Sequence, residues 1–197
     1  KTNLTKGYYY AAIYHRSTNG TITRIATQAP PSTLIYTVFQ NAGYSSNTGV
    51  EMVFQQNFSK AFSFNSNVNI YRNIINAFTV ENKYPVLSIY TAGKEAITSG
   101  NVKLNGIFHL PKKTYIQLTA IYLAPDIIPQ GRIDTRFSVD MGIKKQIQKD
   151  KGELFFNASD IFNTLRIKKT VTGNGFTLAS TDYYETQVIR LGYSYKF

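Results

Sequence analysis

The last nine residues of the chain, Ile189–Phe197, read IRLGYSYKF and alternate apolar with polar or small side chains. Successive side chains of an extended strand point to opposite faces, so this alternation gives the segment two different faces. The apolar face carries Ile189, Leu191, Tyr193, Tyr195 and Phe197, and the other face carries Arg190, Gly192, Ser194 and Lys196. The segment therefore predicts a β-strand with one side in an apolar environment and the other in water.

The same alternation recurs upstream, most clearly at 62–70, 102–122 and 132–144. In the last of these regions, Arg132, Asp134, Arg136, Asp140 and Lys144 all fall on the side opposite Val139. Unpaired charges are too costly to bury, so we expect this side to face water. The charged residues that we predict to line an aqueous lumen are Arg72, Lys103, Arg136, Asp140, Lys144 and Arg190.

About eight segments of this kind are expected, near residues 6–24, 35–56, 61–76, 98–110, 113–124, 132–147, 152–167 and 184–197. They are longer than the five or six residues usual in soluble sheets, and they reach the length that a tilted strand needs to cross a bilayer. This predicts an all-β fold, an antiparallel transmembrane β-barrel. The residues expected to face lipid include Phe64, Val68, Leu104, Leu118, Val139 and Leu191.

The connections between these segments alternate in length. Tight turns are expected at 57–60, 111–113 and 148–152, and long connections at 25–34, 77–97, 125–131 and 168–183. Short turns on one rim and long loops on the other are typical of membrane barrels. Asn19-Gly20 is a strong hairpin signal inside the first segment, but a bulge there keeps the number of strands even, and this is the interpretation we favour.

Composition excludes several other kinds of protein. The 197 residues include no Cys and only two His, so disulfides, thiolate metal sites and multi-histidine sites are excluded, and we expect no metal, cofactor or catalytic activity. No apolar run approaches the roughly 20 residues of a transmembrane helix. The net charge is +11, but the bases are scattered over turns and polar strand faces, so we do not expect nucleic acid as a partner.

Three stretches resemble one family: Ile189–Phe197, the segment FNASDIFNT at 156–164, and 125–131 followed by RFSVD at 136–140. They are similar to the C-terminal half of TonB-dependent-receptor barrels, and more narrowly to the outer-membrane β-barrel family common in Bacteroidetes. The resemblance implies a 22-stranded barrel around a plug, of which residues 1–197 form a single C-terminal segment supplying about the last eight strands. No plug or TonB box is found in this sequence.

The resemblance also implies a location and partners. The chain would be integral to the outer membrane of a Gram-negative cell, in contact with its lipid, and would form the wall of a transporter for a nutrient or metal chelate. TonB would act only through N-terminal regions outside this sequence. The alternating residues Ile189, Leu191, Tyr193, Tyr195 and Phe197 would be the signal that the barrel-assembly machinery reads.

Two alternatives to a transporter segment stay open at this point. One is a complete small barrel of about eight strands with a structural or adhesive role, and the other is a soluble ligand-binding β-barrel. A closed eight-stranded barrel has room only for side chains inside it, and the excess of bases over acids leaves several charges there without partners. We therefore expect residues 8–14 and 189–197 to pair with strands outside this sequence rather than with each other.

Overall fold

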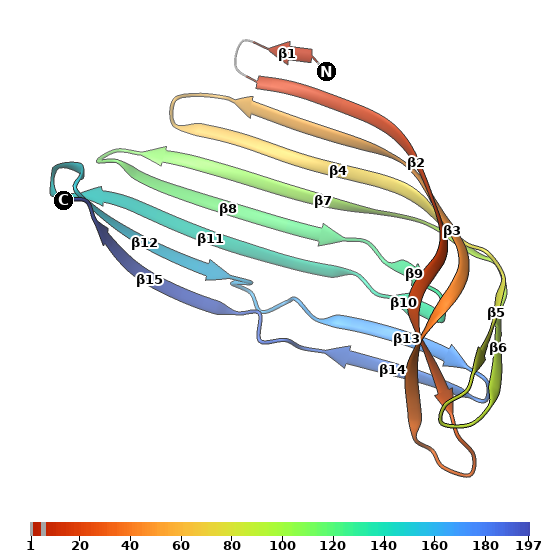
Figure 1. Ribbon diagram of the computed structural model, residues 1–197. Helices are drawn as coiled ribbons and strands as arrows, with labels where there is room; N and C mark the ends of the chain where they lie inside the picture. The colour runs from red at the N-terminus through yellow and green to blue at the C-terminus, as the bar shows by residue number, and fades with distance from the viewer. Residues whose placement is uncertain (1, 5–6) are drawn as a thin grey trace.

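The computed structural model describes residues 2–4 and 7–197, and strands account for most of them (Figure 1). The expected start of the first strand at Lys6 lies outside the described residues. The helical content of the described chain is one short 3₁₀ turn, Gln148–Asp150, and nothing in that part of the chain is a helix long and apolar enough to span a membrane.

Nine strands form one antiparallel sheet in the order β1-β2-β3-β4-β7-β8-β11-β12-β15. Their order follows the chain, so each main strand pairs with the next main strand along the sequence. Their bounds are β1 Thr2–Leu4, β2 Gly7–Gln28, β3 Ile35–Asn57, β4 Phe62–Ile75, β7 Glu95–Leu110, β8 Thr114–Leu123, β11 Arg136–Ile147, β12 Gly152–Ser159 and β15 Val188–Tyr195. The all-β, antiparallel architecture expected from the alternating segments is confirmed.

The long connections fold into hairpins of their own at one end of the sheet, while the tight turns lie at the other end (Figure 1). Strands β5 (Phe78–Asn82) and β6 (Ser88–Ala92) pair with each other. Strands β9 (Asp126–Ile128), β10 (Gly131–Ile133), β13 (Ile167–Gly173) and β14 (Phe176–Asp182) form a separate four-stranded sheet. The predicted separation of long and short connections is therefore present.

Two of the expected segments are longer than predicted: the first runs on to Gln28, into the connection expected at 25–34, and the segment expected at 98–110 begins at Glu95. Three others are shorter by four or more residues at one end. The strand expected at 152–167 ends at Ser159, because Asp160 adopts a positive φ of 44° and turns the chain out of the sheet. The strand expected from residue 132 joins the main sheet only at Arg136, since 131–133 pair with β9 and β13 instead. The last strand begins at Val188 rather than at residue 184.

Asn19-Gly20 is not a hairpin. Strand β2 continues through it, and Asn19 and Thr21 keep the same register with β3, opposite Tyr44 and Ala42. Gly20 and Gly43 both have positive φ, 65° and 44°, so the two strands change direction together without an extra residue on either side. The irregularity that we favoured is present, but it is shared by both strands and adds no unpaired residue.

The register divides the main strands into two faces. Phe64, Val68, Leu104, Leu118, Val139 and Leu191, predicted to face lipid, all fall on the same face, which we call the outer face. The opposite face, which we call the inner face, carries Tyr14, Asn69, Lys103, Thr119 and Asp140 among others.

Arg72 is a correction to the predicted lumen set. It lies four residues after Val68 in a strand whose register with both neighbours is unbroken, and an even separation keeps a side chain on the same face. Arg72 is therefore on the outer face, not on the inner face where we expected it.

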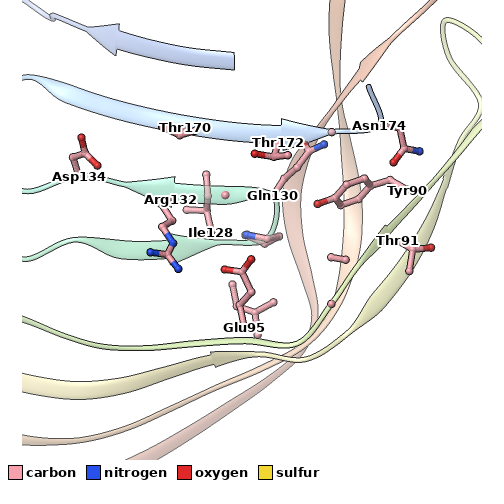
Figure 2. A pocket seen from close by; sticks show the side chains of 16 residues that line it. Tyr90, Thr91, Glu95, Ile128, Gln130, Arg132, Asp134, Thr170, Thr172 and Asn174 are labelled. Atoms are coloured by element: carbon pink, nitrogen blue, oxygen red, sulfur yellow. The ribbon is translucent and has the colours of Figure 1, made fainter. Parts of the chain in front are cut away.

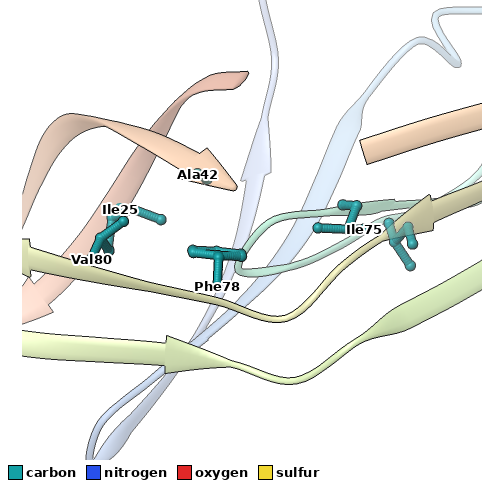
Figure 3. Packing of buried hydrophobic residues seen from close by; sticks show 6 residues of the cluster. Ile25, Ala42, Ile75, Phe78 and Val80 are labelled. Atoms are coloured by element: carbon teal, nitrogen blue, oxygen red, sulfur yellow. The ribbon is translucent and has the colours of Figure 1, made fainter. Parts of the chain in front are cut away.

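A buried apolar cluster lies where the long hairpins meet the sheet (Figure 3). Its members are Ile25, Ala42, Ile75, Phe78, Val80 and Ile127. They come from β2, β3, β4, β5 and β9, so the cluster joins the hairpin end of the sheet to two of the connections. Burial of these side chains holds the hairpins against the end of the sheet.

The sheet remains open in the described part of the chain. Its edges are β1 and β15, and β15 pairs with β12 alone. Strand β1 covers only Gly7–Tyr9 of β2, so the rest of that edge of β2 has no strand beside it among the described residues. Residues 8–14 and 189–195 therefore do not pair with each other.

Candidate functional site

The inner face carries a network of polar side chains across neighbouring strands. Tyr14 donates to Asn69 at 3.0 Å, and Asn67 donates to Glu51 at 2.9 Å. Farther along the sheet, Gln117 and Thr119 both donate to the side-chain amide oxygen Oδ1 of Asn105 at 2.8 Å. Small polar residues on this face, including Asn73, Ser99, Asn105, Thr119 and Ser138, are buried. A face built in this way favours water and polar solutes over lipid.

The connection from β8 to β11 crosses this face. Asp126 accepts hydrogen bonds from the Tyr71 hydroxyl at 2.6 Å and from the Asn73 side chain at 2.8 Å, although β7 lies between β8 and the strand that carries these two residues. The connection therefore passes over β7 on the inner side, where β9 contacts both β7 and β4.

Gln130 extends the crossing as far as β2. Its amide accepts from the Ala26 N–H at 2.6 Å and donates to the Ala26 carbonyl at 2.9 Å. Gln130 is 3% exposed, so these two bonds satisfy an amide that would otherwise be buried without partners. The β9–β10 turn is thereby fixed across the hairpin end of the inner face.

A groove of about 850 Å³ lies on the inner face toward β2, β3 and β4. Its walls include Arg16, Glu51, Tyr71 and Asp126, together with the five asparagines Asn47, Asn67, Asn69, Asn73 and Asn101. Amide, hydroxyl and carboxylate groups dominate this surface, which therefore offers hydrogen bonds to a polar solute rather than an apolar pocket.

A second pocket, of about 540 Å³, lies among the hairpins (Figure 2). Tyr90, Glu95, Arg132 and Asn174 come to it from four different elements or their connections. The side chains of Glu95 and Arg132 form no ion pair with any described residue. Burial, and then the nearby Glu95 carboxylate, raise the pKa of the Tyr90 hydroxyl above its ordinary value.

The other five predicted lumen residues lie on the inner face but do not form one cluster. Lys144 pairs with Glu153 at 2.6 Å, and the Asp140 carboxylate accepts from the Asp160 backbone N–H at 2.8 Å. Lys103, Arg136 and Arg190 form no ion pair within the described chain, and the buried Nε of Arg136 has no hydrogen-bond partner there. Asp140 and Glu153 are thus engaged, whereas Glu95 at the hairpin end of this face forms no ion pair with a described residue. The three bases are available to an anion.

The segment FNASDIFNT, which carried much of the family resemblance, forms a compact turn after β12. Asp160 is 1% exposed, and its carboxylate accepts from the Thr164 and Leu165 backbone N–H groups and from the Thr186 hydroxyl, at 2.9, 3.0 and 2.7 Å. Burial alone would raise the pKa of Asp160, but these hydrogen bonds outweigh it and lower the pKa below its ordinary value. Asp160 therefore ties the end of β12 to the residues that lead into β15.

The alternating residues of the last strand are exposed. Ile189, Leu191, Tyr193 and Tyr195 are on the outer face of β15, and Phe197 follows the strand with its ring 5.4 Å from that of Tyr195. These side chains are accessible to solvent on β15, which is an edge strand of the described sheet.

Sequence reasoning missed Asp126, Gln130 and the pocket among the hairpins. The contacts of Gln130 with Ala26 span 104 positions, and no local pattern in the sequence predicts such a contact. Clusters of His, Asp and Glu able to hold a metal ion are absent from the described residues.

Comparison with known proteins gives one family. The model of the outer membrane protein beta-barrel family matches residues 2–195. No curated protein and no solved structure matches the chain. The family match agrees with the long antiparallel strands, with their apolar outer and polar inner faces, and it implies a location in the outer membrane. The chain belongs to the outer membrane protein beta-barrel family.

Proposed function

We propose that this chain is part of the wall of a wide outer-membrane transporter of the TonB-dependent-receptor type, which takes up an anionic nutrient or metal chelate. The observation that carries the proposal is the open sheet, whose polar inner face bears bases without ion-pair partners among the described residues. An open edge cannot lie unpaired in lipid, so further strands would complete the barrel. With about 22 strands, the lumen is wide enough for water and a plug.

Charge supports an anionic solute. Lys103, Arg136 and Arg190 lie on the inner face, while the acids Glu51, Asp126 and Asp140 are already hydrogen-bonded to neighbouring groups. Basic side chains lining a passage favour anions. The pocket among the hairpins would provide first contact at the mouth, and a plug and TonB box would belong to N-terminal regions outside this sequence.

The absence of cysteine makes the barrel's width testable in the native outer membrane. Cysteines placed at Ala11, on the outer face of β2 beyond the part that β1 covers, and at Leu191, on the outer face of β15, should not be joined by a short thiol cross-linker within one chain. Cysteines at Ala11 and Met52, which are register partners, provide the positive control. Efficient joining of residues 11 and 191 would contradict the wide barrel and support the small closed one.

Transport is tested separately, by uptake in cells. Cells that produce the protein should accumulate an iron(III)–citrate chelate faster than cells lacking it, and a protonophore should abolish the difference if TonB supplies the energy. Replacing Lys103, Arg136 and Arg190 together by glutamine should reduce the uptake severalfold. If cells with the parent protein, cells with the triple variant and cells lacking the protein all took up the chelate at the same rate, the structural or adhesive alternative would be favoured.

Membrane topology provides a further prediction. Because long hairpins lie on the outside of membrane barrels, labels or protease added to intact cells should reach 77–97 and 168–183 and spare Lys112 and Lys149 in the tight turns. Lysed cells provide the control in which all four sites react. Labelling of the turns alone in intact cells would show that the chain is inserted in the opposite orientation.

A further inference from the structure

Arg72 belongs to a row of four polar side chains on the outer face. His15, Thr48, Arg72 and Thr98 are successive register partners on β2, β3, β4 and β7, and all four are exposed. His15 shares a hydrogen bond of 2.7 Å with Thr48, and Arg72 donates to Thr98 at 3.2 Å. The adjacent row toward the tight turns is Ile13, Val50, Ile70 and Gly100, so the apolar surface ends at this polar row.

Aromatic residues form the other limit of the apolar surface on the outer face. Near the tight turns, Phe62 stacks on Phe108 and on Phe58, with ring centroids 4.8 and 5.7 Å apart. Aromatic rings of this kind are typical of the level where hydrocarbon meets the lipid headgroups.

The distance between these two limits matches the height of the apolar layer of an outer membrane. Phe62 and Arg72 are ten residues apart on β4, which is roughly 33 Å along a strand at about 3.3 Å per residue. A tilt of about 40° reduces this to roughly 25 Å along the membrane normal, the height of the apolar band of outer-membrane barrels. Arg72 therefore lies at headgroup level in the leaflet on the hairpin side.

The charge of this row has no counterpart in the protein. Carboxylates are absent from the outer face of the described main strands, and neither His15 nor Arg72 forms an ion pair with a described residue. A guanidinium has five N–H donors, and the bond to Thr98 uses one of them. The remaining donors suit a phosphate, which guanidinium binds in a bidentate manner.

We propose that Arg72, with His15 beside it, binds the phosphate of an anionic lipid in the leaflet on the hairpin side. Thr98 and Thr48 hold the two basic side chains against the sheet, so that they line one headgroup site at the boundary of the apolar band. The site lies on the outer face, on the opposite side of the sheet from the proposed solute passage, and its test does not depend on transport.

The test measures lipid retained by the protein. The protein is extracted from vesicles of equimolar phosphatidylglycerol and phosphatidylcholine, and bound phosphatidylglycerol is counted by native mass spectrometry. Arg72→Gln should reduce retention about tenfold, the loss expected for one charge-assisted bidentate contact. His15→Gln should reduce it less, and Arg72→Lys should retain part of the binding. Lys168→Gln, which removes an exposed charge from β13, is the matched control and should bind like the parent.

Three results would overturn the proposal. The first is equal retention by the parent and by Arg72→Gln, when both migrate as folded barrels in unheated gels. The second is an equal loss in Lys168→Gln, which would show only a general effect of charge. The third is displacement of the lipid by inorganic phosphate at equal concentration, which would identify a site for free phosphate rather than for a lipid.

Discussion

Replacing Val139 by arginine is expected to destabilise the inserted barrel by about 2–4 kcal/mol. Val139 lies on the outer face in the row Phe54, Ser66, Leu104, Ala120 and Val139, near the middle of the apolar run from Phe137 to Ile143 on β11. A guanidinium placed there must either enter hydrocarbon or stretch toward a distant headgroup region. Urea titration of folding into lipid vesicles measures the loss.

His15→Arg is the matched control for Val139→Arg. It adds the same group to the same face, but in the polar row where Arg72 already lies. The cost of arginine falls to about 0–1 kcal/mol near the interface, so this variant should insert almost as well as the parent. If Val139→Arg and His15→Arg had equal stability, the assignment of the outer face to lipid would be wrong.

Asp160→Ala is expected to cost about 2–4 kcal/mol in the free energy of unfolding. The substitution leaves the N–H groups of Thr164 and Leu165 and the Thr186 hydroxyl without their acceptor. Because these residues lead from β12 toward β13 and β15, the connection should loosen and hydrogen exchange at Leu165 should accelerate. Asp134→Ala, at an exposed carboxyl outside the main sheet, provides the control and should change stability little.

The same carboxyl predicts a dependence on pH. The pKa of Asp160 is lower in the folded chain than its ordinary value of 3.8, so its stabilising contribution is fully present above that value. The contribution is lost as the pH falls through the lower folded pKa, because the unfolded chain binds the proton first. Asp160→Asn should remove this part of the acid sensitivity. An unchanged pH profile in Asp160→Asn would show that other carboxyls cause the acid unfolding.

The local alternation of apolar and polar residues was sufficient to predict the strands of the main sheet. In β4, β7, β8 and β11 apolar and polar residues alternate over most of the strand, with exceptions such as Ser66 and Arg72 on the apolar side of β4, and a strand's faces follow directly from a period of two. The family match at residues 2–195 agrees with this interpretation. Arg72 was assigned to the wrong face because its charge suggested the inner face. Its position in the alternation places it on the outer face.

Gly20 shows where local signals conflict. Asn19-Gly20 is as good a turn sequence as any in the chain, yet β2 continues through it. The pairing partner decides the outcome, because Gly43 lies opposite Gly20 and also adopts a positive φ, which allows both strands to bend together. This compensation involves residues that are not neighbours in the sequence, so the choice between bulge and hairpin could not be made from Asn19-Gly20 alone.

The sequence by itself determined the strand order, the two faces and the end at which the long connections lie, since each depends on residues within one strand or one turn. Tertiary structure alone decided what the long connections do. Asp126 meets Tyr71 and Asn73, and Gln130 meets Ala26, because the β9–β10 turn folds across the inner face. These contacts are made by single polar side chains across 53 to 104 positions, so they depend on how distant parts of the chain come together rather than on any repeating pattern in the sequence.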